Sequence, residues 1–294
     1  MIRDLAGKTA VVTGGGGGIG RAMGDRFARE GMQVVLADVV AEDLESAVSE
    51  LRERGFDVTG VETDVTKYRS VEALRDAAID EYGAVHVLCN NAGVGSGAEG
   101  HVWEHELSDW RWALDVNVWG VIHGINAFLP HMLDHGDEGH VVNTSSGNGG
   151  ISPLPTTPVY AVTKASVTII SECLYEQLRQ LDAHVGASVL YPGPNMLRTG
   201  LYESWRHRPA EYAKGKPRET PYATIEDVEE MMRKAGVDVK YTPLEEVAER
   251  VVDAIRASDF WILPPSERTD DQIRARAESM LKRENPTYLQ AFAG

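Results

Sequence analysis

The sequence has little cysteine and no long apolar run. Cys89 and Cys173 are its two cysteines, both in apolar surroundings, so we expect two buried thiols rather than a disulfide or a metal site. C-x-x-C and H-E-x-x-H motifs are absent, and no metal is expected. No apolar stretch approaches the length of a membrane span, and the N-terminal residues lack a signal-peptide core. These absences predict a protein of the reducing cytoplasm.

Positive charge is also scarce. The chain has 29 Lys and Arg against 45 Asp and Glu, and its net charge of −16 would repel a nucleic-acid backbone or an anionic membrane. A hydrophobic content of 43% and a charged content of 25% are typical of a globular protein, and 294 residues suffice for one large core. We therefore expect a small-molecule partner, with no nucleic acid and no membrane.

The first 190 residues alternate β-branched runs with amphipathic segments of helix length. The predicted strands are 9–13, 33–38, 58–65, 85–90, 139–145 and 186–192. The predicted helices are 19–31, 41–55, 68–83, 108–133 and 159–181. Strands that are apolar throughout and separated by helices are typical of a parallel sheet covered on both faces. The pattern predicts a doubly wound α/β fold of the Rossmann type.

The region 194–241 differs in composition: it is rich in charged and aromatic residues, among them Tyr202, Trp205, Tyr212 and Tyr222. An amphipathic helix follows, with Thr242 as its cap and Pro243 at its first position, and then a last strand over 260–264. We expect 1–294 to form a single domain in which 194–241 is a substrate-binding lid.

Five consecutive glycines, 14–18, lie between the first predicted strand and the first predicted helix. Glycines let a pyrophosphate approach the backbone, and a helix N-terminus attracts anions, so a nucleotide loop is favoured over a flexible turn. Two spacings fit: Gly15, Gly17 and Gly20 form G-x-G-x-x-G, and Gly14, Gly18 and Gly20 form G-x-x-x-G-x-G. The motif alone does not choose between them.

Asp38 ends the second predicted strand, 18 residues after Gly20. A dinucleotide fold places an acid here to bind the adenosine ribose. The extra phosphate of NADP would meet like charge, a repulsion of about 1 kcal/mol at ~4 Å in water and more in a cleft. Arg21 is a cation just downstream, and the alternative role of Asp38 is to cap the next helix. These residues favour NAD.

Tyr160 and Lys164 stand four residues apart in a predicted helix and so share one face. A phenol has a pKa of about 10. An adjacent ammonium, with the positive ring of an oxidised nicotinamide, would lower that pKa and permit general acid/base catalysis. The pair is common by chance, so a half-exposed tyrosine beside a surface lysine is the alternative.

With these features the chain resembles the short-chain dehydrogenase/reductase family, in its single-domain branch. The matching motifs, in the family's order, are TGGGGGIG (13–20), DV (64–65), NNAG (90–93), DVNVWG (115–120), VVNTSS (141–146), YAVTK (160–164) and YPG (191–193). The resemblance implies the register of Gly14, Gly18 and Gly20.

The resemblance also implies a catalytic set. Tyr160 would transfer the proton, and Lys164 would bind the nicotinamide ribose and lower the pKa of Tyr160. Ser146 would polarise the substrate oxygen. Ser145 is the alternative, but it lies further from Tyr160 than Ser146, whose spacing is already one residue longer than the family's commonest. Asn117 would hold a water that links Lys164 to solvent, unless it is a buried asparagine bonded to backbone.

The cofactor would be bound through residues from several loops. Thr199 stands about two residues later than the family's hydroxyl residue, so the backbone near Pro194 and Asn195 is an alternative. The implied cofactor-binding set is Gly14, Gly18, Ile19, Gly20, Asp38, Asp64, Val65, Asn90, Ala92, Gly93, Tyr160, Lys164, Pro192, Gly193 and Thr199.

The implied activity is an NAD-dependent interconversion of a secondary alcohol and its ketone. Apolar residues suit a bulky apolar or aromatic substrate: Ile151, Leu154, Pro155, Met196, Leu201, Tyr202 and Trp205. The segment 206–209 is similar to a subgroup that oxidises benzylic alcohols of lignin-type aryl compounds, while steroids and other bulky ketones stay open. A catalytically silent NAD sensor and a non-redox epimerase or dehydratase are alternatives.

Two predicted helices carry more apolar surface than one sheet face needs, with Trp112, Trp119 and Ile169. In the family these helices pair across subunits. The resemblance therefore implies a homo-oligomer, a dimer or a tetramer.

Overall fold

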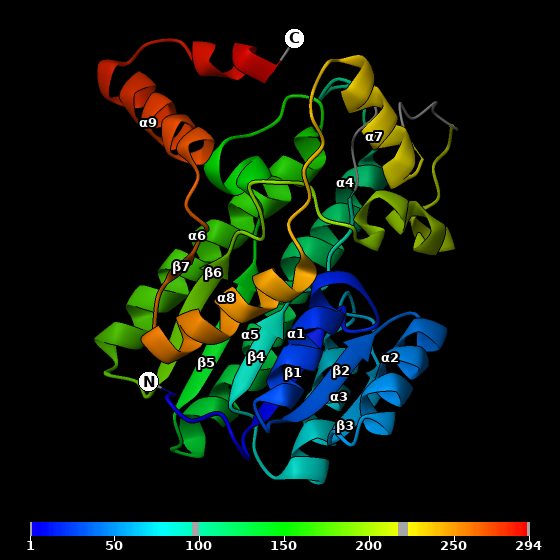
Figure 1. Cartoon of the computed structure of the whole chain (residues 1–294), viewed down its shortest axis with the longest axis vertical. Helices are drawn as coiled ribbons and strands as arrows, with labels where there is room; N and C mark the ends of the chain where they lie inside the picture. The colour runs from blue at the N-terminus through cyan, green and yellow to red at the C-terminus, as the bar shows by residue number, and fades with distance from the viewer. Residues whose placement is uncertain (1, 96–99, 217–222, 293–294) are drawn as a thin grey trace.

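The computed structural model describes residues 2–95, 100–216 and 223–292. Seven parallel strands form one sheet in the order β3-β2-β1-β4-β5-β6-β7 (Figure 1). They are β1 (Thr9–Thr13), β2 (Gln33–Asp38), β3 (Val58–Glu62), β4 (Val87–Asn90), β5 (Gly139–Thr144), β6 (Val185–Leu190) and β7 (Trp261–Ile262). The predicted doubly wound α/β fold is confirmed.

Helices cover both faces of the sheet. One face packs against α1 (Gly18–Arg29), α2 (Ala41–Glu53) and α8 (Leu244–Ala257). The other packs against α3 (Tyr68–Tyr82), α5 (Gly120–Asp134) and α6 (Pro158–Gln180). Successive side chains of a strand point to opposite faces, so Val12 joins the first core and Val11 the second. Because both cores need apolar side chains, the central strands are apolar throughout.

The middle of the sheet creates the site. β1 pairs with β2 on one side and with β4 on the other. The connections that leave β1 and β4 therefore run to opposite faces, which opens a crevice at the carboxyl ends of these strands. The glycine run after β1 and the segment 91–95 after β4 both lie at this edge.

The predicted helix over 108–133 contains a wider turn. α4 (Leu107–Leu114) continues into the π-helical η1 (Asp115–Trp119) and then into α5. Hydrophobic spacing showed no sign of this turn, which carries Asn117. Single π turns inside α-helices often occur at functional sites.

The region 194–241 crosses the carboxyl edge of the sheet. It forms η3 (Gly200–His207), η4 (Ala210–Tyr212) and α7 (Ile225–Lys234), while Tyr222 lies outside the described residues. α8 begins at Leu244 with the extended Pro243 as its cap, so the predicted cap at Thr242 was wrong by one residue. Beyond β7, α9 (Glu267–Lys282) and η5 (Thr287–Phe292) extend away from the sheet (Figure 1).

Five predicted strands extend past the observed ones. Those predicted over 139–145 and 186–192 end at Thr144 and Leu190. The strand over 58–65 ends at Glu62, the one over 85–90 begins at Val87, and the last spans only Trp261–Ile262. Beyond Glu62 and Ile262 the neighbouring strand has ended as well, at Asp38 and Leu190. A residue pattern does not reveal where the pairing partner stops.

The thiol prediction is half wrong. Cys89 is buried in β4, but Cys173 is exposed on α6, and neither forms a disulfide. Among the described residues, no three His, Cys, Asp or Glu side chains are arranged to hold a metal ion. In the same part of the chain, none of the helices is long and apolar enough to span a bilayer.

Candidate active site

A cleft of about 1160 Å³ lies at the carboxyl edge of the sheet. The glycine loop, the ends of β4 and β5, the start of α6, the region 194–241 and the first turn of α9 all contribute to its walls. Most predicted site residues line it: Gly14, Gly18, Ile19, Asp38, Asp64, Val65, Ala92, Gly93, Ser146, Tyr160, Lys164, Pro192, Gly193 and Thr199. Gly20, Asn90 and Asn117 lie behind the walls.

Backbone geometry resolves the glycine register. Gly14 and Gly18 have φ of +67° and +53°, a left-handed conformation that other residues adopt at a cost. Gly17 has an extended backbone with φ of −156°. A Cβ on Gly20 would collide with the carbonyl oxygen of Gly14, so Gly20 is needed for the close contact between loop and helix. The backbone therefore requires glycine at 14, 18 and 20.

The N-terminus of α1 faces the cleft, and no side chain of the described residues caps it. Gly17 provides no side-chain cap, and the first turn of α1 contains no acidic residue. The first amides of a helix lack intrahelical partners, and the helix dipole is positive there. This terminus can accept a phosphate group.

Asn91 fixes the glycine loop to the neighbouring strands; it lies in the NNAG motif, but the motif indicated no role of its own for this residue. Its Nδ2 donates to the carbonyl oxygen of Thr13 at 3.0 Å, and its Oδ1 accepts from the hydroxyl of Thr144 at 3.3 Å. One amide thus joins the ends of β1, β4 and β5.

Asn90 is in a different place from the one predicted. It is 3% exposed, and its Nδ2 donates to Asn143 Oδ1 at 2.9 Å. A Cβ on Gly124 would collide with its Oδ1, so α5 packs directly on this side chain. Successive residues of a strand face opposite sides, which explains why Asn91 lines the cleft and Asn90 does not. The predicted place of the Asn90 side chain in the cofactor floor was wrong.

Asp38 lies at the end of β2 beside the loop. Its two oxygens accept the backbone N–H of Gly16 at 2.9 Å and of Val40 at 3.1 Å. It does not cap α2, whose cap position is Val40. Glu42 and Asp43 line the same part of the cleft, so this end is strongly negative. Arg21, the downstream cation, pairs with Glu50.

Asp64 and Val65 follow β3. The carboxylate of Asp64 accepts from the backbone N–H and the hydroxyl of Thr66, at 2.9 and 2.7 Å, which forms a tight turn. Val65 packs so closely on α5 that a Cβ on Gly120 would lie 3.0 Å from its side chain. The turn presents both residues to the cleft.

Tyr160 and Ser146 face each other across the cleft. Burial raises the pKa of Tyr160 to about 12, and the hydrogen bond from the Ser146 hydroxyl lowers it only in part. Tyr202 lies close enough to raise that pKa further. In the protein alone, burial dominates this pKa. The predicted lowering by Lys164 together with the positive ring of an oxidised nicotinamide stays a prediction for the complex.

Ser145 has another role. Its hydroxyl donates to the carbonyl oxygen of Lys164 at 2.8 Å and contacts the hydroxyl of Thr168 at 2.9 Å. The side chain is buried and its hydrogen-bonding capacity is used within the protein. Of the two serines, Ser146 is the one beside Tyr160.

Lys164 is 3% exposed, and its Nζ donates to the carbonyl oxygen of Thr144 at 2.9 Å. Nζ lies 5.7 Å from the centre of the Tyr160 ring. Burial lowers the pKa of Lys164 to about 8. A Cβ on Gly93 would lie 3.4 Å from this Nζ and 3.3 Å from Asn117 Oδ1, so a glycine leaves space between the two groups.

Asn117 is fully buried in the π turn. Its Oδ1 accepts the N–H of Val94 at 2.8 Å, and its Nδ2 donates to the carbonyl oxygen of Val94 and to Thr163 Oγ1, both at 3.0 Å. Both amide hydrogens are used. The side chain thus fits the alternative of a buried asparagine bonded to backbone, and its amide nitrogen has no hydrogen left for the predicted water.

Thr199 lies against the glycine loop. A Cβ on Gly18 would be 3.2 Å from its side chain, and its Oγ1 accepts the N–H of Leu201 at 3.4 Å. Pro194 and Asn195 also line the cleft. Thr199 and the backbone near these two residues therefore both remain candidates for the role of the family's hydroxyl residue.

The apolar wall differs in two residues from the predicted one. Ile151, Leu154, Met196, Leu201 and Tyr202 line the cleft, whereas Pro155 and Trp205 do not. Trp205 is 53% exposed, and its indole N–H donates to the carbonyl oxygen of Ala223 at 3.1 Å. Trp112, which we expected at a subunit contact, is 3% exposed and forms part of this wall instead.

Comparison with known proteins gives the same family throughout. Residues 8–209 match the family model described as short chain dehydrogenase. Over 196 residues the chain is 35% identical to glucose 1-dehydrogenase 2 of Bacillus subtilis, a match that covers 66% of this chain and 74% of that protein. It is 38% identical over 186 residues to 1-deoxy-11-beta-hydroxypentalenate dehydrogenase of Streptomyces exfoliatus, covering 63% and 66%.

A solved structure extends the likeness to nearly the whole chain. The short-chain dehydrogenase/reductase of Burkholderia phymatum, crystallised in complex with NAD, has 37% sequence identity and a TM-score of 0.87 over 97% of this chain and 98% of that one. The chain therefore belongs to the short-chain dehydrogenase/reductase family of oxidoreductases, which bind a nicotinamide cofactor.

Proposed function

We propose that this chain is an NAD-dependent dehydrogenase that interconverts a bulky apolar or aromatic secondary alcohol and its ketone. The observation that carries the proposal is the meeting of Ser146, Tyr160 and Lys164 in the cleft that also contains the glycine loop and Asp38. A protein that only sensed NAD would need the loop and Asp38 but not two hydroxyls aimed at one point.

The chain fits a dinucleotide at both ends of the cleft. The uncapped N-terminus of α1 and the left-handed Gly14 and Gly18 would hold the pyrophosphate. Gly93 leaves a space bordered by Lys164 and Asn117, which suits the nicotinamide ribose. When bound, the oxidised nicotinamide supplies the acceptor for a hydride.

The negative end of the cleft supports NAD over NADP. Asp38, Glu42 and Asp43 would repel a ribose phosphate. Arg21 cannot offset them while it pairs with Glu50. The NAD bound to the Burkholderia phymatum relative agrees with this preference.

The hydroxyls would bind the substrate oxygen. Ser146 and Tyr160 both donate to that oxygen as charge develops on it in the ketone-reducing direction, and in alcohol oxidation Tyr160 takes its proton. Burial, only partly opposed by the Ser146 hydrogen bond, raises the pKa of Tyr160 to about 12. The ionised form would therefore be stabilised by the charge of the bound oxidised cofactor together with Lys164. We therefore expect the pKa of Tyr160 to be lowered only in the complex with the oxidised cofactor.

Proton exchange with solvent would pass along Lys164. Its Nζ lies near Asn117, and Asn117 belongs to the π turn. Because the amide hydrogens of Asn117 are used, we assign the relay water to the backbone of this turn rather than to the side chain. Pro192, Gly193 and Thr199 would contact the nicotinamide end from the other side of the cleft.

Tyr160→Phe tests the proposal. The phenyl ring keeps the shape but cannot exchange a proton, so turnover should fall by at least about 100-fold while the affinity for NADH stays unchanged. Turnover is followed by absorbance of the reduced cofactor with a panel of secondary alcohols, and affinity by fluorescence titration. A silent sensor or a non-redox enzyme would reduce no NAD with any alcohol in the panel.

We also infer a cytoplasmic location from the low cysteine content.

A further inference from the structure

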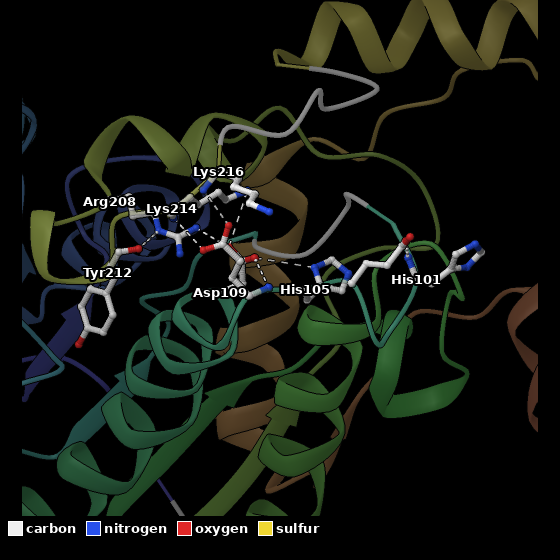
Figure 2. A network of polar contacts seen from close by, with 10 residues as sticks. His101, His105, Asp109, Arg208, Tyr212, Lys214 and Lys216 are labelled. Atoms are coloured by element: carbon white, nitrogen blue, oxygen red, sulfur yellow. Dashed lines mark hydrogen bonds and ion pairs between the residues drawn. The ribbon is translucent and has the colours of Figure 1, made fainter.

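Residues 208–216, which we name the anchor segment, lie on the first turn of α4. Figure 2 shows Arg208 and Lys214 converging on Asp109, with His105 on its far side. The anchor segment belongs to the region 194–241, whose earlier residues form part of the cleft wall. Its attachment therefore bears on the shape of the cleft.

The central contact is a buried ion pair. Asp109 is 1% exposed, and its Oδ1 lies 2.6 Å from Arg208 Nη1 and 3.7 Å from Lys214 Nζ. Its Oδ2 accepts the N–H of Glu106 at 3.2 Å and lies 3.9 Å from His105 Nδ1. A carboxylate at such depth is stable only while its cation remains in place.

Arg208 connects this pair to the cleft wall. Its guanidinium carbon lies 5.0 Å from the centre of the Trp112 ring, and Trp112 lines the cleft. Its Nε donates to the carbonyl oxygen of Tyr212 at 2.7 Å. Its Nη2 is buried and makes no hydrogen bond within the described residues, so the face of Trp112 is a main favourable contact for that side of the guanidinium.

Further bonds fix the anchor segment along α4 and η1. The carboxylate of Glu106 accepts the backbone N–H of Gly215 at 2.8 Å and of Lys216 at 3.0 Å. The hydroxyl of Tyr212 donates to Asp115 Oδ2 at 2.8 Å, at the first residue of the π turn. The segment is thus held at three successive points of one helix.

We propose that Asp109 and Arg208 are positioning residues for substrate selection. Asp109 holds Arg208, and Arg208 holds the ring of Trp112 against the cleft, so the pair sets the apolar wall that a bulky substrate meets. Neither residue lines the cleft, and neither touches the cofactor loop. The inference rests on the proposed function for the class of substrate, but not for the attachment of the segment.

Arg208→Lys separates positioning from simple folding. Lysine keeps the charge for Asp109 but loses the planar face on Trp112 and the bond to Tyr212. The probe is acetophenone, titrated by fluorescence into the complex of the protein with NADH, which requires no turnover. We expect the acetophenone Kd to rise by about tenfold while the NADH Kd and the melting temperature stay close to wild type.

Asp109→Asn and Lys234→Gln complete the set. The asparagine side chain is isosteric but leaves Arg208 without its charge partner, so hydrogen exchange over 208–216 should accelerate and acetophenone affinity should fall. Lys234 forms an exposed pair with Glu230 in the same region of the chain, at 2.8 Å, and its loss should change neither quantity.

An acetophenone Kd unchanged in both Arg208→Lys and Asp109→Asn would overturn the inference, as would a wild-type complex that does not bind acetophenone. If the variants lose acetophenone affinity as expected but wild type oxidises no alcohol, the proposed function fails and the positioning role stands.

Discussion

At the residue scale, the strongest determinant of the site is how deeply its polar groups are buried. Tyr160 and Lys164 have pKa values displaced from their ordinary values, to about 12 and about 8, with burial as the main cause for both. Burial favours the neutral form of each group. At neutral pH both groups therefore carry a proton, and a bound positive charge would favour loss of the proton from Tyr160.

Lys164 makes stability depend on alkaline pH. Its pKa is about 8 when folded and 10.5 when unfolded, so between these values the unfolded chain binds more protons and stability rises with pH. Between pH 8 and 10.5 the free energy of unfolding of wild type should rise by roughly 2–3 kcal/mol relative to that of Lys164→Met. Urea denaturation at several pH values measures this difference. Parallel curves for the two proteins would contradict the lowered pKa of this buried lysine.

Residue identity allowed much of the site to be predicted, but not its orientation. The motif NNAG contains two adjacent asparagines, and only the sheet determines that Asn91 faces the cleft and Asn90 the core. The glycine run fits two spacings, and the left-handed backbone at Gly14 and Gly18 separates them. The cofactor-binding and catalytic roles themselves stay predictions.

At the element scale, hydrophobic periodicity located every strand of the sheet and the helices that cover it. It did not reveal the π turn at 115–119, because one extra residue in a turn scarcely disturbs the spacing of apolar side chains. It also overextended five strands, because β-branched and apolar residues continue beyond the ends of the observed strands.

The amino end of the sheet carries a cluster of histidines opposite the cleft. His86 Nδ1 accepts the N–H of Thr9 at 3.0 Å, and His131 Nε2 accepts the N–H of Val85 at 3.4 Å. The ring of His135 lies 5.4 Å from that of His86 and 5.1 Å from that of His131. A nitrogen that accepts a hydrogen bond cannot carry a proton, so His86 and His131 must be neutral.

The pKa values of His86 and His131 are lowered from 6.5 by burial first. Lys8 further lowers the pKa of His86 by charge repulsion, and Arg75 does the same for His131. His135 lowers the pKa of both. Below pH 6.5 the unfolded chain then binds more protons, so stability is full above that pH and falls as the solution is acidified.

His86→Asn tests this dependence. Its side-chain oxygen can still accept the N–H of Thr9 but does not titrate. The drop in melting temperature between about pH 7.5 and about pH 5 should be smaller than in wild type, as followed by circular dichroism. An equal drop would mean that other groups cause the acid sensitivity.

At the scale of the whole molecule, long-range pairing was what the sequence could not reveal. The anchor segment binds α4 through residues 99 positions apart, Asp109 and Arg208, and neither local spacing nor composition marks such a pair. Trp112 was expected at a subunit contact for the same reason, since apolar helix residues look alike whether they face a lid or a partner.

An apolar patch still supports self-association. Trp119 on η1 and Val162 and Ile169 on α6 are 50%, 44% and 59% exposed, and η1 packs against α6. The two α6 residues are seven positions apart and so lie on one face. Such a patch, on the helices that pair in the family, favours a homodimer or a tetramer.

Ile169→Glu should convert the oligomer to monomers by placing a charge in an apolar contact, as measured by light scattering at micromolar concentration. Met280→Glu on α9, 70% exposed and outside the patch, is the matched control. Wild-type protein that scatters as a monomer would end the oligomer hypothesis.

The contact between Thr199 and Gly18 has a kinetic consequence. Thr199 belongs to the region 194–241 and lies against the glycine loop, so this region would cover a dinucleotide bound on that loop. We therefore expect the coenzyme to bind before the organic reactant and to leave after it. We expect an ordered sequential cycle whose slowest step is departure of the spent coenzyme rather than bond rearrangement.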